Sequence, residues 1–352
     1  MLFISFIDFG DMSSGSSVRP QRMYRAFEEL GYEINLLSGL QNRKLERNRN
    51  VYKKYRELKK NGLPDFCYVE PPSGPFFNLC DHLLLIWLKL KGVPIGLFYR
   101  DAYWKFADWW QVKGLKRFFI VKMQQFDLFI IKRTCKVVFF PTKSMADLFV
   151  FKEPSKGILP PAGDNMILMP HENTNNVVYV GGVSHRYGTD ILLEAFEILN
   201  EQLHIKINLK LVCREAATSV LFEGYRNRHW LEIINASGEA LKSIYNSSDI
   251  AVFSGRRDVY MDFSMPVKLF EYMSYGLPVV TTNCVEAASF VKNNGIGLVA
   301  KDNAQSLAEN IARLYKEPEL KQKIHEQCIK TLLEGNLWQH RAKQAANEIM
   351  GN

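Results

Sequence analysis

Two charged residues within the segment 264–283 (SMPVKLFEYMSYGLPVVTTN) could together bind an anion and a hydroxyl group. Lys268 and Glu271 are three residues apart, so a helix places them on one face. Lys268 falls in the first helical turn, where backbone N–H groups and the helix dipole already favour an anion. Glu271 can accept hydrogen bonds from hydroxyl groups. The pair suits a phosphorylated sugar or a nucleotide; the alternative is an ordinary i,i+3 ion pair on a solvated helix.

The same segment predicts the elements that position this pair. Ser264 and Pro266 are helix-start signals, because proline is tolerated in the first turn, where its missing N–H costs nothing. Gly276 followed by Pro278 is a helix-stop signal. Residues 277–282 are apolar and β-branched, which is typical of a central parallel strand. The segment therefore predicts a short helix, a sharp stop and a buried strand.

The composition indicates a globular protein with two domains. The chain has 352 residues, of which 47% are hydrophobic and 23% charged, and this length exceeds what one core usually serves. Six scattered cysteines without a CxxC pair indicate reduced, buried thiols in a cytoplasmic protein. The opening MLFISFIDFG predicts a first β-strand, not a signal peptide. No segment reaches the roughly 18–20 apolar residues that span a bilayer.

The net charge of +8 is concentrated in the first half of the chain. Residues 1–165 hold 26 Lys and Arg against 16 Asp and Glu, whereas the remainder holds 19 against 21. Nucleic acid, an anionic membrane or a phosphorylated substrate could each explain a basic half. We expect no nucleic acid, because no recognition motif accompanies the charge.

The segment 103–133 interleaves aromatic with basic residues. An amphipathic helix of this composition can lie in a membrane interface, and each basic residue gains roughly 1 kcal/mol near anionic lipid. One interpretation is peripheral attachment to the cytoplasmic face of a membrane. The other is that the aromatic residues are core and the cations form a solvated face. The run 118–121 (FFIV) is compatible with both.

Strand-like and helix-like runs alternate along both halves. A strand at 2–6, a Gly/Ser loop at 10–17, a helix at 19–30 and a strand at 33–37 are the opening of a doubly wound α/β domain. The second half repeats this after a Pro- and Gly-containing connection. We predict two doubly wound, Rossmann-like α/β domains facing each other across a cleft, which is the default binding site. Their expected bounds are 1–165 and 166–330, with a C-terminal helix in 331–352 that packs back on the first domain.

Several stretches resemble the GT-B-fold glycosyltransferases, and are most similar to the retaining family 4 (group 1). In the second half they are GILPPAGD (157–164), VVYVGGVSHRYGTDILLEAFEIL (177–199), SSDIAVFSG (247–255) and MPVKLFEYMSYGLPVVTTN (265–283). In the first half they are FGDMSSGSSVRPQRMYRAFEELGYEINLLSG (9–39), YRDAYW (99–104) and VVFFPTKSMADLF (137–149). The resemblance implies that the first domain binds the acceptor and the second a nucleotide sugar.

The resemblance also assigns roles to residues of the second domain. Lys268 matches the family's pyrophosphate-binding lysine and Glu271 its ribose-binding glutamate, Arg186 would be the second cation, and Ser184 would donate to a phosphate oxygen. The family more often has an arginine and a lysine in this loop where the chain has Gly182 and Tyr187. The implied donor contacts are Gly15, Ser16, Gly182, Ser184, Arg186, Pro266, Val267, Lys268 and Glu271, with base contacts from 213–215 and 233–240.

A second departure concerns the donor sugar. The family places a sugar-contacting glutamate eight residues before the one matched by Glu271, and this position is Phe263. Asp262 is one residue away, and Asp258 lies further upstream. Either Asp262 replaces the missing acid, or the backbone N–H groups of 263–266 hold the sugar hydroxyls.

In the first domain, Asp101 follows a strand at the end where α/β proteins bind ligands. The resemblance implies that it contacts the donor sugar or orients the acceptor hydroxyl; the alternative is a turn aspartate that caps a helix. The loop that holds Gly15, Ser16 and Ser17 could approach the diphosphate or the acceptor, or be a plain loop. Arg19 and Arg22 could bind an acceptor phosphate or be ordinary solvated residues.

These observations predict a glycosyltransferase that moves a hexose from a nucleoside diphosphate sugar, for which we expect UDP, to an acceptor hydroxyl. The chain has no DxD motif, so we expect no metal and no other cofactor. Retention, and a glycan or lipid-linked acceptor in cell-surface polysaccharide synthesis, follow from the resemblance only. Asp101, Arg186, Lys268 and Glu271 are the candidate catalytic residues. The alternatives are a sugar-nucleotide epimerase of the same fold and a non-catalytic sugar-nucleotide-binding partner of a transferase.

Overall fold

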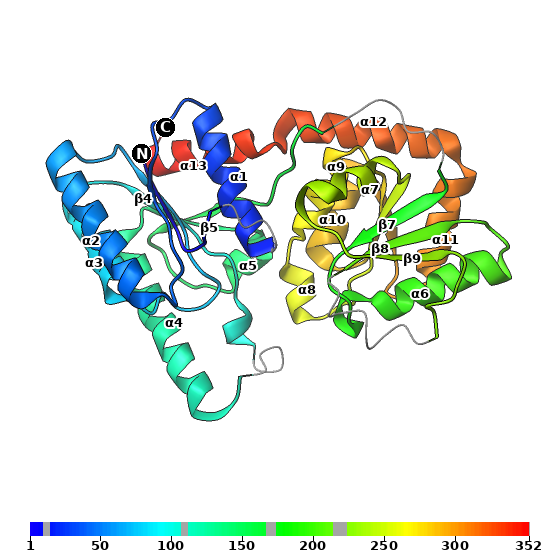
Figure 1. Ribbon diagram of the computed structural model, residues 1–352, viewed down its shortest axis with the longest axis horizontal. Coiled ribbons are helices and arrows are strands. Elements are labelled where there is room, and N and C mark those ends of the chain that lie inside the picture. Colours follow the sequence, from blue (N-terminus) through cyan, green and yellow to red (C-terminus); the bar gives the residue numbers. More distant parts are fainter. Residues whose placement is uncertain (10–14, 107–111, 167–173, 214–223, 352) are drawn as a thin grey trace. The chain divides into compact units, whose positions relative to one another are not determined.

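A computed structural model of the protein describes residues 1–9, 15–106, 112–166, 174–213 and 224–351 (Figure 1). The chain divides into two compact units. The first unit comprises Met1–Pro160 and Trp338–Asn352, and the second comprises Pro161–Leu337. Among the described residues, no helix combines the length and the apolar character that crossing a membrane requires.

The first unit is built on a parallel six-stranded sheet. The strands lie in the order β2-β1-β3-β4-β5-β6. Figure 1 shows α2, α3 and α4 on one face of this sheet and α1 and α13 on the other. The elements are β1 (Leu2–Ser5), α1 (Gly15–Glu29), β2 (Asn35–Leu37), α2 (Lys44–Asn61), β3 (Cys67–Glu70), α3 (Leu79–Leu90), β4 (Ile95–Phe98), η1 (Tyr103–Lys105), α4 (Gly114–Thr134), β5 (Val137–Phe140), α5 (Lys143–Asp147), β6 (Ser155–Ile158) and α13 (Trp338–Met350).

The second unit repeats the architecture around a sheet in the order β12-β11-β10-β7-β8-β9, again all parallel. Figure 1 shows α7, α9 and α10 on one side of its strands and α6 and α11 on the other. The elements are β7 (Asn176–Val180), η2 (His185–Tyr187), α6 (Thr189–Glu197), η3 (Ile198–Gln202), β8 (Asn208–Val212), β9 (Leu231–Ile234), η5 (Gly238–Ala240), α7 (Leu241–Asn246), β10 (Ile250–Phe253), α8 (Val259–Phe263), α9 (Val267–Ser274), β11 (Val279–Thr282), α10 (Val285–Asn294), β12 (Gly297–Ala300), α11 (Ala304–Lys316) and α12 (Pro318–Gly335).

The strand orders confirm the predicted doubly wound α/β class. In each sheet the order reverses once, between β1 and β3 in the first unit and between β7 and β10 in the second. The loops that leave the carboxyl ends of these strands diverge to opposite faces, and such a switch point is where open α/β sheets bind ligands. We therefore expect a ligand of the second unit to bind at the loops after β7 and β10.

Two sequence predictions differ from the structure in their bounds. Helix α1 begins at Gly15, so residues 15–17 belong to the first helical turn and not to a loop; residues 10–14 lie outside the described part of the chain. The C-terminal helix, which we expected within 331–352, begins at Trp338, because Asn336 and Leu337 separate α13 from α12. Helix α12 ends at Gly335, and Asn336 is its C-cap residue. The chain changes units at 160/161 and 337/338.

Candidate functional site

Two loops meet at the switch point of the second unit. One runs from β7 through Gly181 and Gly182 into the short helix η2, and the other leaves β10 at Ser254. The N–H of Arg256 donates to the carbonyl of Arg186 at 3.0 Å, and the hydroxyl of Ser254 donates to the carbonyl of Tyr187 at 2.9 Å. The loop that contains the predicted residues Gly182, Ser184 and Arg186 is thus fixed to the loop after β10.

Gly188 makes this close approach possible. Its φ of 62° lies in the left-handed region, and a Cβ atom at this position would lie 1.7 Å from the carbonyl oxygen of Ser254. No other residue type fits without moving one of the two loops. Ser184 caps η2, because its hydroxyl accepts the N–H of Tyr187. Gly188 therefore allows the loop that carries Arg186 to lie against the loop after β10.

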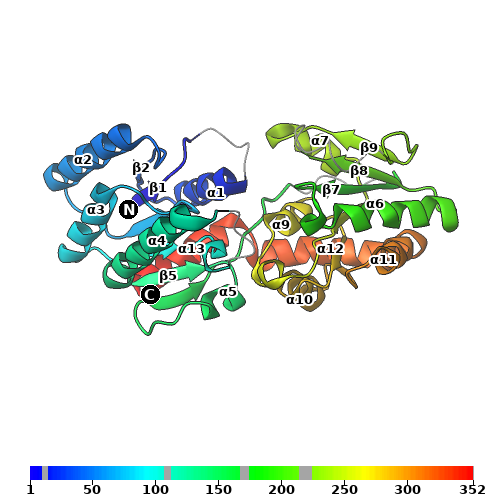
Figure 2. The same cartoon turned by 90° about the horizontal axis from the view of Figure 1, so that it is seen from below.

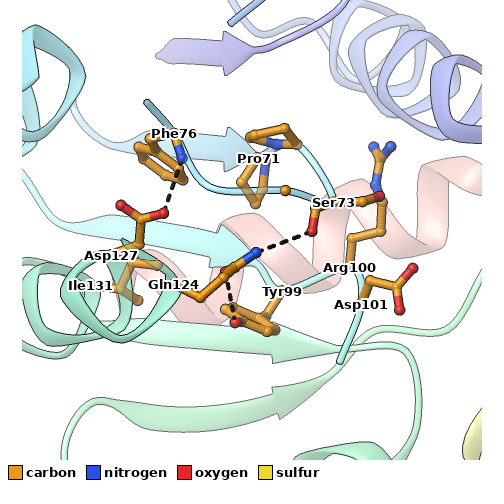
Figure 3. A pocket seen from close by; sticks show the side chains of 11 residues that line it. Pro71, Ser73, Phe76, Tyr99, Arg100, Asp101, Gln124, Asp127 and Ile131 are labelled. Atoms are coloured by element: carbon orange, nitrogen blue, oxygen red, sulfur yellow. Dashed lines mark hydrogen bonds between the residues drawn. The ribbon is translucent and has the colours of Figure 1, made fainter. Parts of the chain in front are cut away.

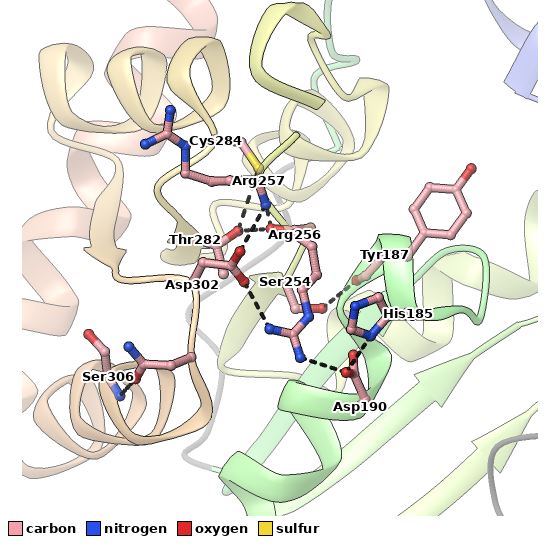
Figure 4. A network of polar contacts seen from close by, with 12 residues as sticks. His185, Tyr187, Asp190, Ser254, Arg256, Arg257, Thr282, Cys284, Asp302 and Ser306 are labelled. Carbon is pink, nitrogen blue, oxygen red and sulfur yellow. Dashed lines mark hydrogen bonds and ion pairs between the residues drawn. The ribbon is translucent and has the colours of Figure 1, made fainter. Parts of the chain in front are cut away.

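A polar network that the sequence analysis missed surrounds these loops (Figure 4). Arg256 pairs with Asp190 at 2.6 Å and with Asp302 at 3.5 Å, and Nδ1 of His185 lies 2.8 Å from Asp190. Burial alone would raise the pKa of Asp190, but hydrogen bonds from Arg256 and His185 outweigh burial and lower this pKa. The adjacent arginines at 256 and 257, directly after an apolar strand, were the sequence signal for this network.

The acidic residues near the missing glutamate are engaged in local structure. Asp262 receives both Nε and Nη2 of Arg257, at 3.1 and 2.8 Å, and also accepts the N–H of Val285 at the start of α10. Asp258 caps α8 by accepting the N–H groups of Tyr260 and Met261, each at 2.8 Å. Phe263 is buried. An apolar side chain in the core thus occupies the position where the family has its acid.

Lys268 and Glu271 meet at the start of α9 as their spacing predicts. Helix α9 begins after Pro266, and Nζ of Lys268 donates to Oε2 of Glu271 at 2.6 Å. The hydroxyl of the buried Tyr245 donates to the same oxygen at 2.9 Å. Burial, and next the charge of Glu271, raise the pKa of Tyr245 well above its usual value, so Tyr245 stays a donor. The pair is an i,i+3 ion pair, but its side chains are only 30% and 25% exposed.

Asp101 lies in the first unit, at a pocket after β3 and β4 (Figure 3). Its Oδ1 accepts the N–H of the next residue, Ala102, at 2.9 Å, but Asp101 does not cap the helix η1 that follows, whose N-cap residue is Ala102. From α4, Gln124 donates to the carbonyl of Ser73 at 3.3 Å, and Asp127 accepts the N–H of Phe76 at 2.9 Å. The pocket is lined by Pro71, Pro72, Ser73, Gly74, Phe76, Tyr99, Arg100, Asp101, Gln124, Asp127 and Ile131.

The predictions for Arg19, a solvated residue or one that binds an acceptor phosphate, are wrong. It is buried, pairs with the equally buried Glu70 at 3.0 Å, and its guanidinium carbon lies 3.4 Å from the ring centre of Phe98. Its Nη1 also donates to the carbonyl of Pro160. Arg19 is therefore a charged core residue of the first unit, neither solvated nor placed to bind an acceptor phosphate. Arg22, on the same helix, is half-buried.

Comparison with protein families identifies the second unit. Residues 167–331 match the family model "Glycosyl transferases group 1". Residues 167–331 are therefore similar to a group 1 glycosyltransferase domain. This domain includes Ser184, Arg186, Lys268 and Glu271, whereas Gly15, Ser16 and Asp101 lie outside the matched residues. The match supports glycosyl transfer as the activity. Comparison with curated protein sequences gives no match.

Solved structures of glycosyltransferases share the fold of both units. A glycosyltransferase from Rickettsia africae is 14% identical with a TM-score of 0.71 over 100% of this chain and 99% of that one. WaaG, a glycosyltransferase involved in lipopolysaccharide biosynthesis, is 17% identical with a TM-score of 0.65 over 100% of both chains. Anabaena HepE in complex with UDP is 12% identical with a TM-score of 0.68 over 100% of this chain and 99% of that one. At these identities the likeness shows the fold, which is GT-B.

Proposed function

We propose that the protein transfers a hexose from a nucleoside diphosphate sugar, with UDP as the nucleotide, to the hydroxyl group of an acceptor. The observation that carries the proposal is the Lys268–Glu271 pair at the start of α9, held by Tyr245 within the group 1 domain. The Anabaena structures of HepE with UDP and with UDP-glucose support a UDP-sugar donor for this fold.

In the proposed complex, the ion pair between Lys268 and Glu271 is replaced by one between Lys268 and the diphosphate of the donor. The diphosphate accepts hydrogen bonds from Lys268 and from N–H groups at the start of α9, where the helix dipole favours an anion. Glu271 keeps its hydrogen bond from Tyr245 and accepts further hydrogen bonds from the hydroxyl groups of the ribose. Arg186 and Ser184 supply further donors to the phosphates. These groups stabilise the charge that develops on the departing diphosphate, which is the main requirement of glycosyl transfer.

We further propose that the reaction retains the anomeric configuration and needs no metal. The departing diphosphate oxygen takes the proton of the acceptor hydroxyl, so no side chain has to serve as general base. In the first unit, Asp101 orients the acceptor, and the backbone around Gly15 and Ser16 approaches the reacting groups. The acceptor is a glycan or a lipid-linked sugar of cell-surface polysaccharide synthesis, bound at the inner face of a membrane.

A second candidate function is favoured by one observation. Phe263 is buried where the family has a sugar-contacting acid, and Asp262 is engaged by Arg257. A protein that binds the nucleotide sugar without turnover, as the partner of an active transferase, would need no such acid.

Labelled UDP-, GDP- and dTDP-sugars, each incubated with and without a pool of glycan and lipid-linked acceptors, separate these functions. We expect labelled product only when acceptor is present. An epimerised nucleotide sugar formed without acceptor would identify an epimerase. Donor binding with no turnover against any acceptor would identify the non-catalytic partner, and absence of binding by all donors would contradict the proposal.

A further inference from the structure

Helix α4 has one covered face, which is partly polar, and one exposed face that is apolar. Its buried residues include Gln124, Asp127, Ile130 and Ile131, which face the rest of the first unit. Five large apolar residues at spacings of three, four or seven lie on the opposite face, because these spacings keep residues on one side of a helix. They are Leu115 (78% exposed), Phe118 (56%), Phe119 (62%), Phe126 (45%) and Phe129 (48%).

The exposure of this stripe excludes the interpretation that its aromatic residues belong to the core. Isolated exposed apolar residues are common, but a contiguous row of them marks an interaction site. Phe118 and Phe119 are therefore not core residues. Trp109 and Trp110, which belong to the same segment, lie outside the described residues.

Helix α3 extends the apolar surface. It packs against α4, and the ring of its residue His82 lies 5.2 Å from the ring of Phe126. Leu79, Leu83 and Leu90 of α3 are 67%, 62% and 79% exposed. Figures 1 and 2 both show α3 and α4 side by side. We call these three leucines and the five residues of α4 the α3–α4 surface.

The charges on α4 are almost all positive. The helix carries Lys116, Arg117, Lys122, Lys132 and Arg133. Its single acid, Asp127, is buried and bound to His82 and to a backbone N–H.

Two of these cations lie over exposed rings of the surface. Nζ of Lys122 is 5.6 Å from the ring centre of Phe118, and the guanidinium carbon of Arg133 is 3.5 Å from that of Phe129. Cations that extend along exposed aromatic rings can reach anionic headgroups while the rings enter the apolar layer.

We propose that the α3–α4 surface docks on an anionic lipid bilayer. An anionic bilayer matches both properties of the surface, since its apolar layer takes the leucine and phenylalanine side chains and its headgroups take the cations. A second protein of ordinary composition would have to supply an apolar face that is also acidic. The described helices do not span a membrane, so the attachment is peripheral.

Docking also bears on the acceptor, and this step rests on the proposed function. Gln124 and Asp127 line the pocket of Figure 3 from the covered face of the same helix. A bilayer on the exposed face would therefore lie about one helix diameter, roughly 10 Å, from this pocket. An acceptor whose lipid stays in the bilayer would present its sugar at the surface beside Asp101, which lines this pocket, so we assign the acceptor to the lipid-linked class.

Vesicle sedimentation tests the docking surface without requiring catalysis. Full-length protein is mixed with vesicles of phosphatidylcholine alone or with about one third phosphatidylglycerol. We expect the protein to sediment with the anionic vesicles, and the double variant Phe118→Ser/Phe119→Ser to partition at least about tenfold less. The control Leu203→Ser changes a comparably exposed residue (43%) of the second unit and should sediment as wild type does. Lys116→Glu/Lys122→Glu should lose binding to anionic vesicles specifically.

Calorimetric titration of UDP-glucose into the same variants separates this inference from the proposed function. Phe118→Ser/Phe119→Ser should bind the donor as wild type does while losing the vesicles. Equal sedimentation of this variant and wild type, or no sedimentation of wild type with anionic vesicles, would overturn the docking surface. A wild-type dimer without vesicles that dissociates in the double variant would also overturn it, because a second copy would then cover the surface.

The acceptor class is tested with the active enzyme. Transfer to a polyprenyl-linked sugar in vesicles should fall in the double variant, whereas transfer to the same sugar with a short soluble tail should stay as in wild type. Equal transfer to the vesicle-bound acceptor by both proteins would contradict the assignment.

Discussion

Lys268 and Glu271 lie three residues apart, and any helix brings such residues together, so their 2.6 Å contact was predictable from the sequence. Arg256, in contrast, meets Asp190, which lies 66 residues away in the chain. Only the parallel arrangement of β7 and β10 brings their loops together, and no local pattern contains that information. The burial of Arg19 was not predicted for a related reason, since its buried partner Glu70 is 51 residues away in the chain.

We expect Glu271→Ala to lower turnover at least about tenfold, because the ribose loses a charged hydrogen-bond acceptor. The free energy of unfolding should fall by about 1–3 kcal/mol, because the buried Tyr245 hydroxyl loses its acceptor, whereas the partly exposed ion pair with Lys268 contributes little. Steady-state kinetics and urea unfolding measure the two quantities.

Glu334→Ala is the matched control, because it removes the exposed ion pair with Lys330 on α12, outside the candidate site. It should leave both turnover and stability unchanged. Wild-type turnover in Glu271→Ala would exclude the ribose-binding role of this residue.

At the scale of elements, short apolar runs next to glycine or proline residues predicted strands such as β1, β2 and β11. Strand β3 was not predicted, because its sequence CYVE ends in a carboxylate whose burial depends on partners such as Arg19 and Arg100, which lie far away in the chain. Helix α3 was not predicted either. Its sequence LCDHLLLIWLKL is apolar on nearly every side, so it lacks the one-sided period of a surface helix. The same property leaves leucines on the α3–α4 surface.

Gly188 allows the two loops of the candidate site to approach each other. We expect Gly188→Ala to lower the free energy of unfolding by about 1–2 kcal/mol for the left-handed backbone and by at least about 1 kcal/mol more for the contact with Ser254. Urea unfolding measures the loss, and donor affinity should fall with it because the loop of Arg186 is displaced.

Gly238→Ala isolates the backbone contribution. Gly238 has a φ of 59°, but a Cβ atom there would have no neighbour within 4 Å. It should show only the smaller loss. Equal losses in the two variants would mean that Gly188 does not limit the approach of the loops.

At the scale of the whole molecule, the alternation of strands and helices predicted two doubly wound units, and the strand orders confirm them. The positions at which the chain changes unit depend on packing that the pattern does not reveal. In α13 the buried residues include Trp338, Ala342, Ala346 and Ile349, and the helix packs against α1. Small alanines allow that approach, but their spacing in the sequence does not show at which residue the chain passes from one unit to the other.

The basic excess of the first 165 residues acquires a location at this scale. Part of it lies on α4 beside an exposed apolar stripe, and part is buried, as at Arg19 and Arg47. Arg47 pairs with Asp81 inside the first unit at 2.8 Å. The net charge therefore showed that the cations are concentrated in one half of the chain, but it could not separate buried cations that stabilise the fold from cations on the surface.

Isothermal titration calorimetry with UDP-glucose tests donor binding at Lys268 most directly. We expect wild type to bind, and Lys268→Ala to bind at least about tenfold more weakly, because the diphosphate loses a charge-assisted hydrogen bond. Lys330→Ala, the control on α12, should bind as wild type does. If UDP-glucose does not bind, the same titration is made with GDP- and dTDP-sugars. Unchanged affinity in Lys268→Ala, or no binding of any of these donors to wild type, would contradict a donor site at α9.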